Sequence, residues 1–361
     1  MKKVLLPIVA LVLALGLALP MATPAAAATL EVGPGKTYAT IQAAVNAANP
    51  GDTIIVAAGT YNEGIIVIDK ELTIVGDPLD KPVIKPTEDT GGIFLAIGPT
   101  GRGWFQITGG PVEFEDLVFD GNGKAIYIAI LYHVGGLGGT VKNCDFKNIQ
   151  YNQYKGRGIS NYGGYVEVLD STFTNIQRIG VFTGEEFAES LIKGCTYTGK
   201  GDGNWLDYAF EVGAGARAII EDNTVIDCHG EGSGWSSAGI YVHEAFGPGT
   251  SATITGNTIS NNTHGIAVGY GQNDTSDVVA NYNNIVGNAS YGISSTAPSV
   301  DATNNWWGHA SGPSGEDGRV NKKGKVIGKG DAVSANVEWD PWLPQPIGHT
   351  KHDPVPPGLL K

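Results

Sequence analysis

Gly-Ile-Tyr-Val-His (239–243) and Gly-Ile-Ala-Val-Gly (265–269) are two copies of a short phrase that recurs through the second half of the chain. The phrase returns every 22 to 30 residues. Its other copies are Gly-Ile-Ser-Asn-Tyr (158–162), Gly-Val-Phe-Thr-Gly (180–184), Ala-Phe-Glu-Val-Gly (209–213) and Gly-Ile-Ser-Ser-Thr (292–296). Each copy alternates along a β-strand and has no helical period. Repeats of this length built only from short strands predict a parallel β-solenoid, in which each coil stacks on the next.

A second phrase lies between the copies of the first and begins with Asn or Asp, as in Asn143-Cys-Asp-Phe146. When the coils are aligned on this phrase, Cys144 and Cys195 take the position of Ser171, which belongs to the coil between them. Coils stack about 4.8 Å apart, so residues two coils apart are too distant for a disulfide bond. We therefore expect both thiols to be free and buried, and Cys228, which falls in a turn, to be free as well.

The N-terminus has the pattern of a secretory signal peptide. Lys2 and Lys3 precede an apolar run from Val4 to Leu19, and Ala25–Ala28 offers an Ala-x-Ala cleavage site. A membrane anchor is the alternative, but the run is short for a membrane span. We expect residues 1–28 to be removed, leaving a secreted, periplasmic or cell-surface protein with no transmembrane segment in the mature chain.

The chain is acidic, with 36 Asp and Glu against 23 Lys and Arg and a formal net charge of −13. A surface of this sign repels phosphate backbones and anionic lipids. We therefore expect no nucleic-acid partner.

The two ends of the repeat region have their own patterns. Residues 37–49 form one apolar helical face, with Thr40 as its N-cap. Such a helix can cover the open core of a first coil. After Trp307 the repeat stops, and four tryptophans are placed to cover the last coil: Trp306, Trp307, Trp339 and Trp342. We predict a signal peptide at 1–28, a β-helix domain with its N-terminal cap at 29–308, and a C-terminal capping segment and tail at 309–361.

Motifs at both ends extend the pattern. They are Tyr38-Ala-Thr-Ile-Gln-Ala-Ala-Val-Asn-Ala-Ala-Asn-Pro-Gly-Asp52, Val56-Ala-Ala-Gly-Thr-Tyr-Asn-Glu63, Leu72-Thr-Ile-Val-Gly-Asp77, Asn304-Asn-Trp-Trp-Gly308, Ser311-Gly-Pro313 and Trp339-Asp-Pro-Trp342. Through them the chain resembles right-handed parallel β-helix proteins of the pectin-lyase-like superfamily, over nearly the whole mature length. The resemblance implies an all-β fold, a single-stranded right-handed parallel β-helix. It does not fix an activity, because one fold hosts many functions. The Gly-Arg-Pro-Trp segment of pectin methylesterases and the paired-Asp motif of polygalacturonase-like hydrolases are both missing.

The repeat predicts which side chains share a surface. In each phrase Ile and Val face inward, and the residues between them face outward. One outward column therefore contains Ser160, Phe182, Glu211 and Tyr241, and the next contains Tyr162, Gly184, Gly213 and His243. We expect an open trough beside the glycines. We also expect that substituting one of the exposed polar residues lowers the free energy of unfolding by at most about 1 kcal/mol. The candidate catalytic residues are His243, Tyr241 and Glu211. The candidate substrate-binding residues are Tyr162, Arg157, Lys155, Glu244 and Asp207.

These residue types suit a sugar polymer. Tyrosine offers a stacking face, Glu and His supply acid and base, and Arg or Lys neutralises a uronate carboxylate. We therefore expect the protein to bind and cleave an extracellular polysaccharide, as a lyase or a glycoside hydrolase. The alternative is a non-catalytic cell-surface or scaffold protein, whose outward polar residues are simply solvated. A periplasmic maturation factor is the third option.

We expect no cofactor and no resident metal. The one candidate ion is Ca²⁺, because Asp202-Gly-Asn204 near Asp207 offers the oxygen ligands that this cation prefers. Most such segments are only turns.

Overall fold

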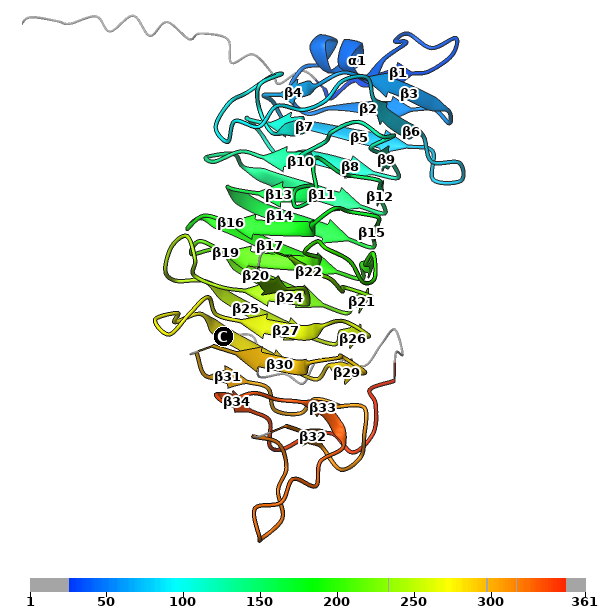
Figure 1. Ribbon diagram of the computed structural model, residues 1–361. Coiled ribbons are helices and arrows are strands. Elements are labelled where there is room, and N and C mark those ends of the chain that lie inside the picture. The colour runs from blue at the N-terminus through cyan, green and yellow to red at the C-terminus, as the bar shows by residue number, and fades with distance from the viewer. Residues whose placement is uncertain (1–25, 233, 297, 316, 349–361) are drawn as a thin grey trace, which may run out of the picture.

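The computed structural model describes residues 26–348 apart from 233, 297 and 316, so the predicted signal peptide lies almost entirely outside the described residues. The chain winds into a stack of coils that runs from the N-terminal helix to the C-terminal segment (Figure 1). Within the described part, the coils build three long parallel sheets of twelve, nine and nine strands, which we call sheets A, B and C. The predicted right-handed parallel β-helix is confirmed.

Strands that follow one another in the three sheets come from successive coils. Sheet A contains β1 (Thr29–Val32), β2 (Asp52–Val56), β5 (Leu72–Gly76), β8 (Val112–Glu115), β11 (Gly138–Lys142), β14 (Gly164–Leu169), β17 (Ala188–Lys193), β20 (Arg217–Glu221), β25 (Ser251–Thr255), β28 (Asp277–Asn281), β31 (Val300–Asp301) and β34 (Val337–Glu338). Sheet B contains β3 (Thr60–Glu63), β6 (Val83–Pro86), β9 (Val118–Asp120), β12 (Asp145–Lys147), β15 (Thr172–Thr174), β18 (Thr196–Thr198), β21 (Thr224–Ile226), β26 (Thr258–Ser260) and β29 (Asn284–Val286). Sheet C contains β4 (Ile66–Ile68), β7 (Gly103–Ile107), β10 (Ile128–Tyr132), β13 (Arg157–Asn161), β16 (Ile179–Gly184), β19 (Tyr208–Gly213), β24 (Ala238–Val242), β27 (His264–Val268) and β30 (Tyr291–Ser295). Two small pairs complete the set, antiparallel β22 (Glu231–Gly232) with β23 (Trp235–Ser236), and parallel β32 (Pro313–Ser314) with β33 (Gly330–Ala332).

The core is a set of stacked like side chains. Phe119, Phe146 and Phe173 lie one above the other, with ring centroids 5.0 Å apart and planes 7° from parallel. This stacking follows from the register, which pairs Phe119 with Phe146 and Phe146 with Phe173. The same register brings Cys144, Ser171 and Cys195 to equivalent positions, as the sequence alignment predicted.

An asparagine ladder continues the cysteine column inside the solenoid. Its members are Asn223, Asn257, Asn283 and Asn305, and the Oδ1 of each of the last three accepts the backbone N–H of the one before it at 2.8–3.0 Å. The ladder satisfies backbone groups at a turn that water cannot reach, which is the condition for burying them. The three cysteines are free and buried; burial was expected for Cys144 and Cys195 and was not predicted for Cys228.

The helix and the tryptophans occupy the two ends of the stack. Helix α1 (Ile41–Ala47) begins after Thr40, whose hydroxyl accepts the N–H of Ala43, and it buries Ile41, Ala44 and Val45. At the other end Trp307 is fully buried, while Trp339 and Trp342 are partly buried and pack against the main core. Strand β34 of this segment pairs with β31, and the boundary at residue 308 stays a prediction. No helix of the described residues is long and apolar enough to cross a membrane.

Candidate functional site

The outer face of sheet C carries a second apolar cluster, separate from the solenoid core. Its buried members are Tyr127, Ile128, Leu131, Tyr162, Ile179, Phe182, Leu206, Tyr208 and Ala238. Segments between the strands cover it. Phe94 packs on Tyr162 with ring centroids 4.8 Å apart, and Tyr151 packs on Tyr127 at 5.0 Å. This face is therefore roofed over much of its length, unlike the solvated exterior expected of a solenoid.

The first outward column is confirmed, because Ser160 pairs with Phe182, Phe182 with Glu211, and Glu211 with Tyr241 in successive strands. The expected open trough is wrong. A Cβ at Gly184 would lie 2.3 Å from the ring of Phe182, and one at Gly213 would lie 3.0 Å from the ring of His243. The glycines accommodate neighbouring rings, so the space beside them is filled.

Glu211 and His243 form the polar centre of this face. They are 3 % and 2 % exposed, and His243 Nε2 lies 3.3 Å from Glu211 Oε1. His243 Nδ1 accepts the backbone N–H of Ala245 at 3.1 Å, so in the neutral ring the proton is on Nε2 and is donated to the carboxylate. Burial would raise the pKa of Glu211, but the His243 bond and the charges of Arg178 and Arg157 lower it overall. Glu211 is therefore an ionised carboxylate, and both ring nitrogens of His243 are engaged.

Three buried polar atoms on this face have no hydrogen-bond partner among the described residues. They are Ser160 Oγ, Arg178 Nε and Glu211 Oε2, which come from three successive coils. Unpartnered buried polar atoms are costly and call for an explanation such as a bound molecule. A hydroxyl, a guanidinium N–H and a carboxylate oxygen together suit a ligand with both donors and acceptors.

Arg157 lies beside this group and is held by two contacts. Its Nη1 donates to the hydroxyl of Tyr162 at 2.8 Å, and its Cζ lies 4.2 Å from the ring centroid of Phe182. Arg178 lies above the ring of Tyr208 at 5.8 Å. Two guanidinium groups near one buried glutamate make this part of an acidic protein locally cationic.

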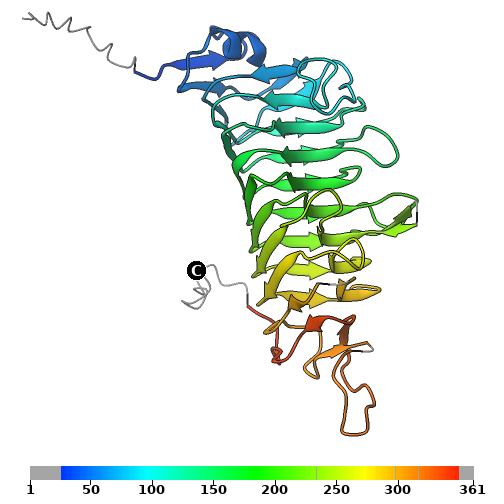
Figure 2. The same ribbon diagram turned by 90° about the vertical axis from the view of Figure 1, so that its left-hand side faces the viewer.

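Aromatic rings continue from the pair toward solvent. We call Trp235, Tyr241, Phe246 and Tyr270 the aromatic platform, in which Tyr241 is partly buried and the other three are exposed. Trp235 stacks on Tyr270 with centroids 5.1 Å and planes 12° apart. The His243 ring lies 4.3 Å from that of Tyr241, 5.9 Å from Phe246 and 6.3 Å from Tyr270. The hairpin that carries Trp235 projects from the side of the stack (Figure 2). Sequence reasoning found Tyr241 and missed the other three. The available signal was that Tyr270 directly follows Gly269, which is equivalent to His243 in the next coil.

The remaining predicted site residues lie elsewhere. Asp207 is fully buried, bonded to the hydroxyl of the core residue Tyr197 and paired with Lys200 Nζ at 3.1 Å, so it offers no free carboxylate on this face. Burial raises its pKa. Because Asp207 is paired with Lys200, it is not a free ligand for the Ca²⁺ ion that we considered at Asp202-Gly-Asn204. Lys155 is exposed, with its Nζ 5.7 Å from the ring centroid of Tyr127.

Glu244 braces two loops beside the platform. Its carboxylate accepts the N–H of Gly249 at 2.5 Å and both the N–H and the hydroxyl of Thr275 at 2.9 Å. A cavity of about 390 Å³ lies between these loops, lined by Glu244, Tyr270 and Asp274 among others. No group of three or more His, Cys, Asp or Glu side chains that could hold a metal ion is present in the described part of the chain.

Comparisons with known proteins agree with this architecture. A family model described as "Right handed beta helix region" matches residues 127–306, and one described as "Protein of unknown function (DUF1565)" matches residues 31–204. No curated protein matches the sequence.

Among solved structures, the A-module of a mannuronan C-5 epimerase from Azotobacter vinelandii is similar at 16% identity and a TM-score of 0.49, over 75% of this chain and 74% of that one. A pectin methylesterase from Erwinia chrysanthemi is similar at 15% identity and a TM-score of 0.42, over 69% and 82%. The enzyme of the same name from Aspergillus niger has 15% identity and a TM-score of 0.42, over 79% and 86%. These identities are too low to transfer an activity. The chain folds as a right-handed parallel β-helix, and the matching model for such a region covers residues 127–306.

Proposed function

We propose that the protein binds an extracellular polysaccharide on the outer face of sheet C, through the aromatic platform. The observation that carries this proposal is the exposure of the platform rings, at 45% for Trp235, 51% for Tyr270 and 77% for Phe246. Exposed aromatic clusters of this kind mark binding surfaces. A sugar ring packs its C–H face on an aromatic ring and keeps its hydroxyls in water, which matches side chains that are apolar on one side and wet on the other.

The site favours a polymer that carries carboxylates. Arg157 and Arg178 supply positive charge in a chain whose net charge is −13, so the attraction is local and directional. A guanidinium binds a carboxylate through two parallel hydrogen bonds. The unpartnered Ser160 hydroxyl and Arg178 N–H are suitable donors for the same group. The predicted signal peptide supports a location outside the cytoplasm, where such polymers occur.

Cleavage by β-elimination is a second candidate, favoured by the unpartnered Oε2 of ionised Glu211. Glu211 would remove the C5 proton of a uronate, the C4–O bond would break, and a C4=C5 double bond would form. Tyr241 is the candidate acid for the leaving oxygen, because burial raises its pKa and keeps its hydroxyl protonated. His243 would orient Glu211, since both its nitrogens are engaged. Glu211 is 3% exposed, so the groups that cover it must move to admit a substrate.

Binding to a panel of neutral and uronate-containing polysaccharides tests the proposal. We expect at least one polymer to bind and the Trp235→Ala, Tyr270→Ala double variant to weaken binding at least tenfold. Tyr165→Ala is the matched control, because Tyr165 is 47% exposed on the outer face of sheet A. If no polymer binds, or if the platform and control variants behave alike, the proposal fails and a scaffold role is favoured. Unsaturated products absorbing in the ultraviolet, absent in Glu211→Gln, would establish elimination.

A further inference from the structure

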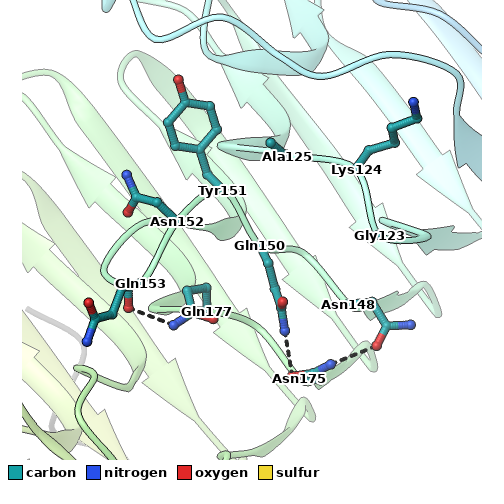
Figure 3. Close-up of a pocket in the computed structure, with 10 residues that line it drawn as sticks. All are labelled: Gly123, Lys124, Ala125, Asn148, Gln150, Tyr151, Asn152, Gln153, Asn175 and Gln177. Carbon is teal, nitrogen blue, oxygen red and sulfur yellow. Dashed lines mark hydrogen bonds between the residues drawn. The ribbon is translucent and has the colours of Figure 1, made fainter.

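The turns that lead into sheet C hold a second cavity, of about 470 Å³, on the edge between sheets B and C. It lies two or more coils from the aromatic platform along the stack, since its residues precede β10, β13 and β16, whereas the platform residues lie around β24 and β27. Six of its ten lining residues are Asn or Gln (Figure 3): Asn148, Gln150, Asn152, Gln153, Asn175 and Gln177. Its lining includes only one charged side chain, that of Lys124.

The amides are fixed in position by one another. Gln150 Nε2 donates to Asn175 Oδ1 at 2.9 Å, Asn175 Nδ2 donates to Asn148 Oδ1 at 2.8 Å, and Asn148 Nδ2 donates to Asp120 Oδ1 at 2.8 Å. Figure 3 shows Gln150, Asn175 and Asn148 joined by the first two of these hydrogen bonds. Asn148 and Asn175 both have positive φ, which Asn tolerates better than most residues and which accounts for their choice at these turns. Gln150 and Gln177 have no such backbone requirement.

Several amide groups remain unused. Gln150 Oε1 and Gln177 Oε1 accept no hydrogen bond from the described residues, while the nitrogens of both side chains are anchored, that of Gln177 to the carbonyl of Gln153 at 2.7 Å. An anchored amide presents its free oxygen in a fixed direction, and each amide retains a second N–H. The cavity therefore offers preorganised, uncharged donors and acceptors side by side.

We propose that this amide cavity binds a neutral sugar unit, at a site distinct from the aromatic platform. A sugar carries adjacent hydroxyls that both donate and accept, which matches neighbouring carbonyl and N–H groups of amides. The lining includes only one cation, Lys124, so it offers no pair of positive charges for a carboxylate or a phosphate. Tyr151 rises from the same turn and supplies an aromatic ring at the edge of the cavity (Figure 3).

Titration with neutral tetrasaccharides of glucose, mannose, galactose and xylose, with tetragalacturonate as the charged comparator, tests this site. Isothermal calorimetry on the folded protein should detect at least one neutral ligand. We expect Gln150→Ala and Gln177→Ala each to weaken it tenfold or more. Gln150→Glu keeps the shape of the side chain and should weaken it similarly, because the anchoring donor is replaced by an acceptor. Gln42→Ala is the matched control, since Gln42 lies on α1 and its side chain likewise donates to one Asn.

The outcome separates this site from the aromatic platform. In the Trp235→Ala, Tyr270→Ala double variant, tetrasaccharide binding should persist and should still depend on Gln150. Polymer binding at the platform can therefore fail while the amide site stands, and the reverse also holds. The proposal is overturned if no neutral tetrasaccharide binds, or if Trp235→Ala abolishes binding and the glutamine variants do not. It is also overturned if tetragalacturonate binds as tightly as the neutral ligands in a Gln150-dependent manner.

Discussion

His243 Nε2 lies 3.3 Å from Glu211 Oε1, although the two residues are 32 positions apart in the sequence. They meet because Glu211 pairs with Tyr241 in the next strand, and His243 follows Tyr241 by two residues on the same face. The pair is buried, so each side chain satisfies a polar group that water does not reach. Because the pair is buried, replacing one of its members should cost more stability than replacing a residue of a surface pair.

His243→Ala should destabilise the protein by about 2–3 kcal/mol, because it leaves a buried carboxylate oxygen without its hydrogen bond. This exceeds the cost of about 1 kcal/mol expected for an exposed residue. Urea unfolding followed by circular dichroism measures the difference. The double variant Glu211→Gln, His243→Gln removes the buried carboxylate together with its partner and should lose less than His243→Ala alone. Equal losses in the two would show that the pair has no special role.

The loops around Glu244 and Asp274 should loosen in acid. Burial would raise both pKa values, but hydrogen bonds lower them overall. For Asp274 these come from the Ser276 hydroxyl and from backbone N–H groups, including that of Glu244. For Glu244 they come from Thr275 and Gly249. A lowered pKa in the folded state stabilises the ionised form. This contribution is complete above the ordinary carboxyl pKa of about 4 and is lost as pH falls through the lowered values.

Hydrogen exchange in residues 244–249 and 270–276, measured at pH 6 and below pH 4, checks this expectation. Exchange should rise in acid after correction for the intrinsic rate, while sheet B keeps its protection. Asp274→Asn should produce loose loops already at pH 6. Loops that stay protected at pH 3 in the wild type would contradict the assignment.

The three thiols should be unreactive in the folded protein. Burial raises the pKa of Cys144 and of Cys195 to about 12 and holds that of Cys228 well above its usual range, so almost no thiolate is present at neutral pH. Iodoacetamide should label none of them natively and all three after denaturation. Mass spectrometry without reduction should detect no disulfide. A Cys144–Cys195 crosslink would mean that the coil register is wrong.

Asn257→Ala should break the asparagine ladder. Asn257 Oδ1 accepts the backbone N–H of Asn223, and its Nδ2 donates to the carbonyl of Ile220, so the change leaves both groups unpaired inside the solenoid. Each such group costs about 1–3 kcal/mol, and the melting temperature should fall by several degrees. Asn46→Ala on the exposed face of α1 is the control and should not lower it. Similar melting temperatures for the two variants would exclude a stabilising role for the ladder.

The sequence by itself determined the fold and the register. Repeats of 22 to 30 residues specify identical coils, and in a parallel stack identical positions must lie above one another. That reasoning placed Ser160, Phe182, Glu211 and Tyr241 in one column and aligned Cys144 with Cys195, both of which the strand pairing confirms. Local patterns also specified the helix, because the cap at Thr40 and the spacing of Ile41, Ala44 and Val45 are short-range signals.

Only the tertiary structure decided how the outward columns are used. The irregular segments between strands differ in length from coil to coil, so no repeat specifies where they fold. They place Phe94 on Tyr162 and bring Trp235 against Tyr270, 35 residues away, while the rings of Phe182 and His243 fill the expected trough. The side chain of Asp207 likewise points toward Lys200 and the core. A residue outside the strands has no inward–outward alternation from which its direction could be predicted. Strand periodicity determines whether a side chain points inward or outward. Whether an outward side chain is buried depends on the loops that cover it, and the paths of these loops are set by long-range packing.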